Sequence, residues 1–136
     1  YDSFKWKMNP LSVDAVIIYA QKGHGIRSGI FSDYTFAIFN DEKDTEELVP
    51  FAKAYSGLSN ADMKLIDSKI KKITEESYGP VKKVRPEIIV ELLFDSISES
   101  KRHKSGIAVR FPRMKRIRFD KKLNDIDRLS SLKKLI

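Results

Sequence analysis

The chain has 136 residues, of which 41% are hydrophobic, so it can form one compact domain with a buried core and is not a disordered chain. It has a formal net charge of +7 and no cysteine, which excludes disulfides and thiolate metal sites. The sequence contains neither an apolar run long enough to span a membrane nor a signal-peptide pattern. We therefore expect an intracellular protein. Because the chain begins at Tyr1 and not at Met, we also expect a fragment of something longer.

The positive charge is concentrated in one segment. Between Lys101 and Lys122 there are ten Lys or Arg residues and one Asp, a local charge of +9. The remainder has 16 basic and 18 acidic residues, or −2. Concentrated positive charge is typical of a surface that binds a polyanion. Charge alone leaves a second interpretation equally open, namely a solvated face that only keeps the protein soluble.

Apolar, β-branched runs between turn residues predict a mainly β chain. The first two runs flank a glycine-rich loop and predict a hairpin. In the last run, Ile107, Val109 and Phe111 alternate on one face until Pro112 interrupts the ladder. The predicted strands cover residues 13–20, 33–39, 48–57, 86–94 and 106–111. Further along, Ile117 and Phe119 are expected to point one way and Arg116 and Arg118 the other.

Two helices are predicted from the spacing of apolar residues. The first covers about residues 60–73, and Asp67 and Lys71 are placed to pair on its solvent side. Its apolar residues are Met63, Ile66, Ile70 and Ile73. The second is capped by Asn124 and Asp127, with Ile126, Leu129 and Leu132 on one side. Five strands with a helix between the third and fourth, and a C-terminal helix, match the order of an OB-fold, a Greek-key barrel that often binds nucleic acid.

RFPRMKRIRFDK, residues 110–121, is the strongest functional signal in the sequence. It contains four arginines and two lysines, more than a plain surface strand needs. The guanidinium group of arginine can donate two parallel hydrogen bonds to the oxygens of one phosphate. Asp120 lies between Arg118 and Lys121 and can orient one of them by a salt bridge. The segment therefore predicts a phosphate-binding strand.

Two other stretches give weaker signals. In FKWKM, Lys5 and Lys7 lie about 7 Å apart on one face of an extended chain, where they either straddle a phosphate or face water. The loop GHGIRSG lacks the spacing of a dinucleotide fingerprint, and a strand follows it. Its glycines either form a flexible hairpin loop or let the backbone approach a phosphate chain. We find no His/Asp/Ser arrangement and no P-loop, so nothing indicates a complete enzyme.

These stretches resemble ATP-dependent DNA ligases. RFPRMKRIRFDK is similar to motif VI of that family, with its Arg-x-Asp-Lys element at residues 118–121. FKWKM resembles motif V, and GHGIRSG resembles the glycine-basic loop of the ligase OB domain. AKAYSGLSNADM resembles the segment that joins the third strand to the helix. The resemblance covers nearly the whole chain in the right order.

The resemblance implies that residues 1–12 are the end of an adenylation domain and a swivel linker, and that residues 13–136 are the OB-fold domain. Such ligases use ATP and Mg²⁺, and their partner is nicked double-stranded DNA. A KxDG lysine of the adenylation domain attacks ATP, and this chain contains no KxDG, so we expect no ligation by it alone. The resemblance implies a role in DNA replication, repair or recombination, and it does not distinguish among the three.

The resemblance also assigns roles to individual residues. Asp120 would orient its neighbours, and neither a catalytic residue nor a metal ligand is expected in this chain. The residues implied to bind the ATP phosphates are Lys5, Lys7, Arg116, Arg118 and Lys121. The residues expected to contact the DNA backbone are Lys22, His24, Arg27, Lys104, Arg110 and Arg113.

Two alternatives stay open. One is a free-standing OB module that binds single-stranded nucleic acid by stacking bases on exposed aromatic side chains. Most aromatics here are expected on core faces, which disfavours it. The other is a relative of mRNA-capping enzymes or RNA ligases, which have motifs similar to motifs V and VI of the DNA ligases. The RFPR element points to DNA ligases instead.

Overall fold

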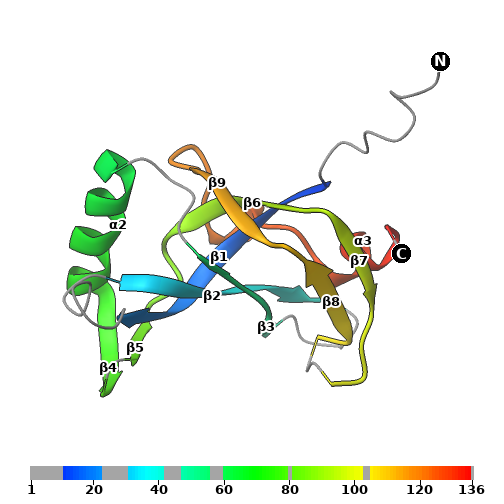
Figure 1. The fold of residues 1–136 in the computed structure, drawn as a ribbon, viewed down its shortest axis with the longest axis horizontal. Helices are drawn as coiled ribbons and strands as arrows, with labels where there is room; N and C mark the ends of the chain where they lie inside the picture. The colour runs from blue at the N-terminus through cyan, green and yellow to red at the C-terminus, as the bar shows by residue number, and fades with distance from the viewer. Residues whose placement is uncertain are drawn as a thin grey trace.

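The computed structural model describes residues 11–22, 31–41, 47–55, 60–79, 81–102 and 105–135, and it is mainly β (Figure 1). The strands are β1 (Leu11–Lys22), β2 (Phe31–Asn40), β3 (Glu47–Tyr55), β4 (Thr74–Tyr78), β5 (Val81–Val84), β6 (Ile89–Phe94), β7 (Ser96–Glu99), β8 (Ile107–Arg110) and β9 (Arg113–Ile117). The helices are α2 (Asn60–Ile73), the 3-10 helix η2 (Leu123–Asp125) and α3 (Leu129–Lys133). None of the helices in these ranges is long and apolar enough to cross a membrane.

Five of these strands close into a barrel. β1 pairs antiparallel with both β2 and β6, β2 pairs with β3, and β6 pairs with β9. The ring closes where β9 meets β3 in parallel, through the pair Tyr55 and Arg113. α2 follows the third barrel strand. This strand order and the position of the helix are those of an OB-fold, so the predicted fold class is confirmed. The fifth barrel strand is β9, however, and not the strand predicted at residues 106–111, where β8 forms a separate two-stranded sheet with β7.

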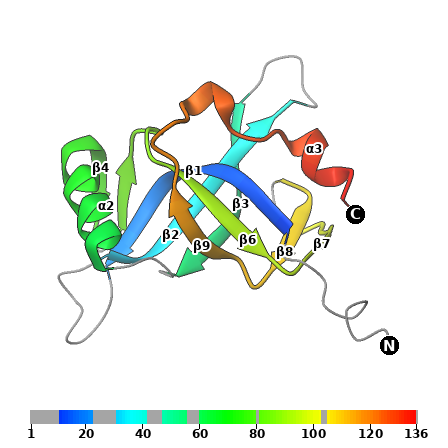
Figure 2. The same cartoon turned by 90° about the horizontal axis from the view of Figure 1, so that it is seen from above.

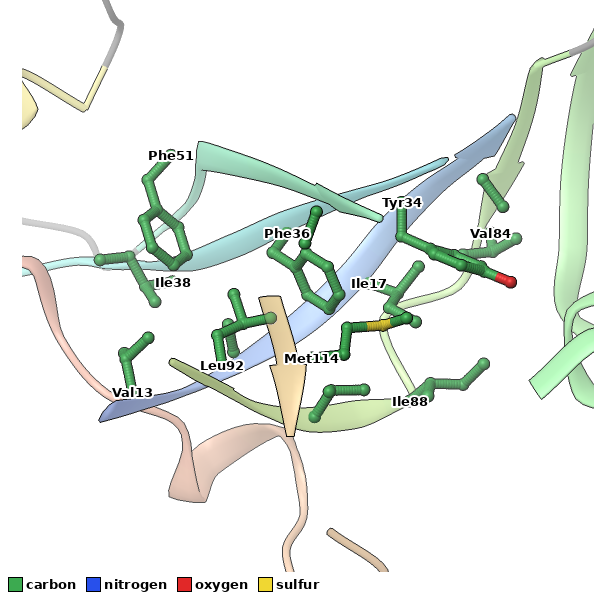
Figure 3. Packing of buried hydrophobic residues seen from close by; sticks show 14 of the residues in the cluster. Val13, Ile17, Tyr34, Phe36, Ile38, Phe51, Val84, Ile88, Leu92 and Met114 are labelled. Carbon is green, nitrogen blue, oxygen red and sulfur yellow. The ribbon is translucent and has the colours of Figure 1, made fainter. Parts of the chain in front are cut away.

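The interior of the barrel is one apolar cluster. Figure 3 shows Met114 of β9 among Ile17, Phe36 and Leu92, and all four side chains are buried. The alternation of side chains along each strand explains this, because every second residue of a strand points to the same face. Met114 is the buried residue of β9, whose sequence RMKRI contains three basic residues. Met114 therefore anchors this basic strand to the core.

The two helices lie at opposite ends of the barrel (Figures 1 and 2). α2 begins and ends where its apolar spacing predicted, and Ile66, Ile70 and Ile73 join the barrel core. The expected pair on its outer side also forms, since Lys71 Nζ lies 3.2 Å from Asp67 Oδ2. α2 therefore covers one open end of the barrel.

Three strands are missed by sequence reasoning. β4 and β5 form a hairpin, and no strand was predicted between residues 74 and 84. β7 pairs with β8, and no strand was predicted at its residues. β4 and β7 are mostly exposed and carry polar side chains, so they lack the apolar alternation that identifies a strand. Gly79 joins β4 to β5 with a φ of 63°, a conformation that glycine adopts without strain.

The C-terminal segment differs from the single helix that was predicted. Ile126, Leu129 and Leu132 are buried as expected, but the segment is broken into η2 and α3. Asn124 and Asp127 do not cap it, because the N-cap positions are Lys122 and Arg128.

Hydrogen bonds tie this segment to the barrel. Asp127 Oδ2 accepts from the backbone N–H of Asp14 at 2.7 Å, and the N–H of Asp127 donates to the carbonyl of Asp14 at 3.0 Å. The N–H and hydroxyl of Ser130 both donate to Asp41, at 3.0 and 2.6 Å. The C-terminal segment is therefore bound to β1 through Asp14 and to Asp41, the residue that follows β2.

Candidate phosphate and nucleic-acid interface

A row of charged residues crosses three barrel strands. Asp14 on β1 lies opposite Glu91 on β6, and Glu91 lies opposite Arg116 on β9. Residues directly opposite each other in a sheet point to the same face, so the three side chains share one face. The register brings a carboxylate pair from the first and fourth barrel strands against the basic strand.

Three cations of the motif VI segment, Arg116, Arg118 and Lys121, make ion pairs with the carboxylates of this row. Arg116 Nε donates to Glu91 Oε1 at 2.6 Å. Arg118 Nη1 donates to Asp14 Oδ1 at 3.3 Å and lies 3.8 Å from Glu91 Oε1. Lys121 Nζ donates to the other oxygen of the same carboxylate, Asp14 Oδ2, at 2.6 Å. Arg118 and Lys121 therefore share one carboxylate of β1.

Asp120 holds the other edge of Arg118. Its two oxygens accept from Nε and Nη2 of Arg118, both at 3.1 Å, which is the bidentate fork geometry of Arg and carboxylate. The predicted orienting contact thus forms inside the Arg-x-Asp-Lys element, and the partner is Arg118. We call Asp14, Glu91, Arg116, Arg118, Asp120 and Lys121 the ion-pair cluster.

Hydrogen bonds favour the charged forms of three members of the cluster. The bond from Arg118 lowers the pKa of Asp120 from 3.8 to about 2. The bond to Asp120 raises the pKa of Arg118, and the bond to Asp14 raises the pKa of Lys121. Hydrogen bonds to the charged form of a group favour that form. Arg118, Asp120 and Lys121 are therefore held in their charged forms.

The cations differ in how far they reach solvent. The side chain of Arg116 is 58% exposed, that of Lys121 is 30% exposed and that of Arg118 is 16% exposed. Phe119 was expected to point the same way as Ile117, yet Phe119 is 75% exposed whereas Ile117 packs against the barrel core. β9 ends at Ile117, so the strand alternation stops before Phe119.

The other end of the basic segment carries an exposed aromatic ring. Phe111 was expected to share a core face with Ile107, yet it is 62% exposed and has a φ of 54°. This left-handed conformation at the break between β8 and β9 turns the side chain outward. The guanidinium of Arg110 lies 5.1 Å from the ring centroid. Arg113 Nη1 donates to the carbonyl of Phe111 at 3.0 Å and to Asp95 at 3.1 Å.

A small pocket lies where α2 meets the end of β9. Leu65 and Lys69 of α2 line it together with Phe119 and Lys121, and its volume is about 110 Å³. Pockets that enclose a drug-sized ligand measure about 300–1,000 Å³. This pocket is therefore too small to enclose a nucleotide.

Several predicted site residues cannot be placed. Lys5, Lys7, His24, Arg27 and Lys104 lie outside the described residues, and so does the side chain of Lys22 at the end of β1. Among the described residues there is no group of three or more His, Asp, Glu or Cys side chains that could hold a metal ion. The Mg²⁺ implied by the resemblance therefore has no ligand set in that part of the chain, and we derive no step through it.

Two carboxylates of the cluster were missed by sequence reasoning. Asp14 interrupts the apolar run VDAVIIYA, and Glu91 interrupts EIIVELLF. A charge inside a buried strand is costly unless it is paired, so each of these residues signals that a cation lies nearby. The identity of that cation depends on strand register, which the local sequence does not give.

Fold and site together define a class: an OB barrel whose basic strand, β9, lies between β3 and β6. Residues 27–121 match the family model described as "ATP dependent DNA ligase C terminal region". The chain therefore belongs to this family of ligase C-terminal domains.

The relatives agree with the family match. The chain is 40% identical over 131 residues to a probable DNA ligase of Opitutus terrae, and 42% identical over 125 residues to one of Koribacter versatilis. These matches cover 96% and 92% of the chain, but 13% and 21% of the relatives. The chain thus spans about a fifth or less of their length.

Solved structures share the fold. The ligase domain of LigD from M. tuberculosis superposes with a TM-score of 0.68 at 15% identity, over 88% of this chain and 39% of that one. A mycobacterial DNA ligase D complexed with ATP and MES gives a TM-score of 0.64 at 13% identity, over 88% of this chain and 38% of that one. At these identities the likeness supports the fold alone.

Proposed function

We propose that this domain closes over ATP while the adenylation domain of the same protein forms lysyl-AMP, and that it then grips nicked duplex DNA for sealing. The observation that carries the proposal is the ion-pair cluster, which gathers Arg116, Arg118 and Lys121 at one edge of the barrel. Family membership supplies the reaction class, and the cluster supplies the groups that act in it.

The first step needs positive charge at the leaving group. A lysine nitrogen of the adenylation domain attacks the α-phosphorus of ATP, the bond from that phosphorus to the bridging oxygen breaks, and pyrophosphate leaves with the electron pair. Fixed cations aimed at this developing charge stabilise the transition state. Arg116 is the most exposed cation of the cluster and is the best placed to meet the β- and γ-phosphates. Lys5 and Lys7 are predicted to reach the α-phosphate.

The second step needs contacts that do not depend on the base sequence of the DNA, because a ligase seals nicks between any bases. Contacts to the phosphate backbone meet this need. Arg110 and Arg113 flank the exposed Phe111 at the far end of the basic segment, so charge and an aromatic surface are presented together. Lys22, His24, Arg27 and Lys104 are predicted to extend this surface.

A binding module for single strands is the second candidate. Exposed Phe111 and Phe119 favour it, because bases stack on exposed aromatic rings, whereas most aromatics of the chain were expected on core faces. A capping or RNA-ligase relative is the third, and it would use GTP or RNA in the same kind of site.

The test compares substrates with the full-length protein. We expect labelled lysyl-AMP from ATP, with little from GTP, and sealing of nicked duplex DNA. We expect the 136-residue chain alone to form no lysyl-AMP. Tight binding of single strands without lysyl-AMP formation would contradict the proposal in favour of the binding module. Labelling by GTP or sealing of RNA alone would favour the third candidate.

A further inference from the structure

We propose that Asp14 is a positioning residue for the phosphate-binding cations, holding Arg118 and Lys121 in the orientation in which the motif VI segment meets ATP. The inference rests on the proposed function and adds to it a residue of β1, about a hundred positions before the basic segment. The carboxylate itself is not expected to touch ATP.

The backbone of Asp14 is fixed on two sides. Within the barrel it is paired with Glu91 of β6. On its other side its N–H and its carbonyl both bond to Asp127, at 2.7 and 3.0 Å. Asp14 is therefore a rigid point, built from the barrel and from the segment that follows motif VI.

The carboxylate of Asp14 uses both of its oxygens on the motif VI segment. Oδ1 accepts from Arg118 at 3.3 Å and Oδ2 accepts from Lys121 at 2.6 Å. Asp14 is only 8% exposed, and a carboxylate so far removed from water is stable only when cations compensate it. The two cations therefore stabilise the buried carboxylate, and the carboxylate in turn fixes the two cations. Asp14 precedes Arg118 by 104 residues and Lys121 by 107 residues in the sequence.

The geometry favours positioning over competition with phosphate. Arg118 is held on one edge by Asp120 and through Nη1 by Asp14, so the two carboxylates fix its plane. Lys121 has three N–H donors, of which Asp14 takes one. Phosphate oxygens can add to Lys121 and to exposed Arg116 without breaking the attachment to Asp14. Losing that attachment would free the segment after β9 to move.

The test uses the full-length protein with four variants. Asp14→Asn removes the charge at nearly constant shape, and Asp14→Glu keeps the charge on a longer side chain. Asp67→Asn is the matched control, because it removes a paired carboxylate from α2 outside the cluster. Arg116→Ala reports on the proposed function itself. For each variant we would measure kcat/KM for lysyl-AMP formation, sealing of a nick that already carries AMP, and the melting temperature.

We expect Asp14→Asn to lower kcat/KM for lysyl-AMP formation about tenfold to a hundredfold, the range typical of lost orientation, with sealing retained. Asp14→Glu should recover part of this loss, and Asp67→Asn should behave as wild type. Unchanged or faster adenylation in Asp14→Asn would overturn the inference, since Asp14 would then be idle or a competitor of phosphate. Loss of both steps with a lower melting temperature would overturn it too, because Asp14 would then only hold the barrel together.

The Arg116→Ala variant separates the two ideas. If Arg116→Ala impairs adenylation and Asp14→Asn does not, the inference about Asp14 fails and the proposed function stands. If Arg116→Ala adenylates normally, the assignment of the cluster to ATP fails, and the inference about Asp14 fails with it.

Discussion

Glu91 Oε1 accepts a hydrogen bond of 2.6 Å from Arg116 Nε, across the pair that β6 and β9 form in the barrel. Glu91 comes from the middle of an apolar strand and is nearly buried, whereas Arg116 is largely exposed. One end of this pair is therefore fixed by the barrel core, and the other end is presented to solvent. A charged side chain held in this way is oriented before a phosphate arrives, which reduces the entropy lost on binding.

We expect Glu91→Gln to destabilise the 136-residue chain by about 1 to 3 kcal/mol, because the charge-assisted bond to Arg116 is lost from a largely buried position. Urea unfolding measures this. Glu87→Gln is the matched control, since Glu87 pairs with Arg85 on the surface and both side chains are about half exposed. The control should change the free energy of unfolding by less than about 1 kcal/mol. Equal effects of the two substitutions would contradict the account.

The stability of the chain should fall steeply in acid, in part through Asp120. Its pKa is about 2 in the folded chain and 3.8 ordinarily, because Arg118 hydrogen-bonds its charged form. A carboxylate with a lowered folded pKa contributes stability above its unfolded pKa, and this contribution is lost as the pH falls from 3.8 toward 2. In Asp120→Asn the free energy of unfolding should therefore depend less on pH in this window. Urea unfolding at several pH values checks this, and identical slopes in both proteins would contradict it.

The basic strand should depend on one buried residue for its anchorage. Met114→Ala is expected to cost about 2 to 5 kcal/mol, because it opens a cavity where β9 meets the core. Phe119→Ala, five residues later, should change the free energy of unfolding by less than about 0.5 kcal/mol, because this ring is exposed. Chemical denaturation of the two variants measures both values. A costly Phe119→Ala would mean that Phe119 packs in a way this account does not include.

Arg113 should contribute to nick binding through phosphate. Arg113→Ala in the full-length protein is expected to weaken binding of nicked duplex DNA equally for different sequences. It should also reduce the slope of log K against log salt concentration by about one. Lys71→Ala on α2 is the matched control, because it removes one exposed positive charge away from the basic strand. A salt slope that Lys71→Ala lowers as much as Arg113→Ala would mean that only total charge matters.

Sequence patterns predicted the periodic elements well. α2 lies where its apolar spacing placed it, and the predicted order of strands and helix is that of the observed OB barrel, although its fifth strand is β9 and not the strand predicted at residues 106–111. The pattern failed where periodicity ends. Phe111 lies at the break between β8 and β9, and Phe119 lies beyond the end of β9, so neither follows the alternation of the strand.

The ion-pair cluster could be predicted only in part. The bond from Arg118 to Asp120 joins close neighbours in one short motif, and sequence reasoning expected a contact of this kind. The bonds to Asp14 and Glu91 depend on the register of β1, β6 and β9, which is a property of the closed barrel. Long-range register is set by the packing of many side chains at once. The local sequence therefore does not show that Asp14 and Glu91 belong to the cluster.

The most direct test of the central claim compares the two chemical steps in the Arg116→Ala/Arg118→Ala double variant of the full-length protein. Labelled lysyl-AMP formed from ATP reports the first step, and sealing of a nick that already carries AMP reports the second. If these arginines act on the ATP phosphates, adenylation should fall by about a hundredfold to a thousandfold while sealing is retained. Normal adenylation in the double variant would contradict the account and would make the basic strand a DNA-binding or solvated face.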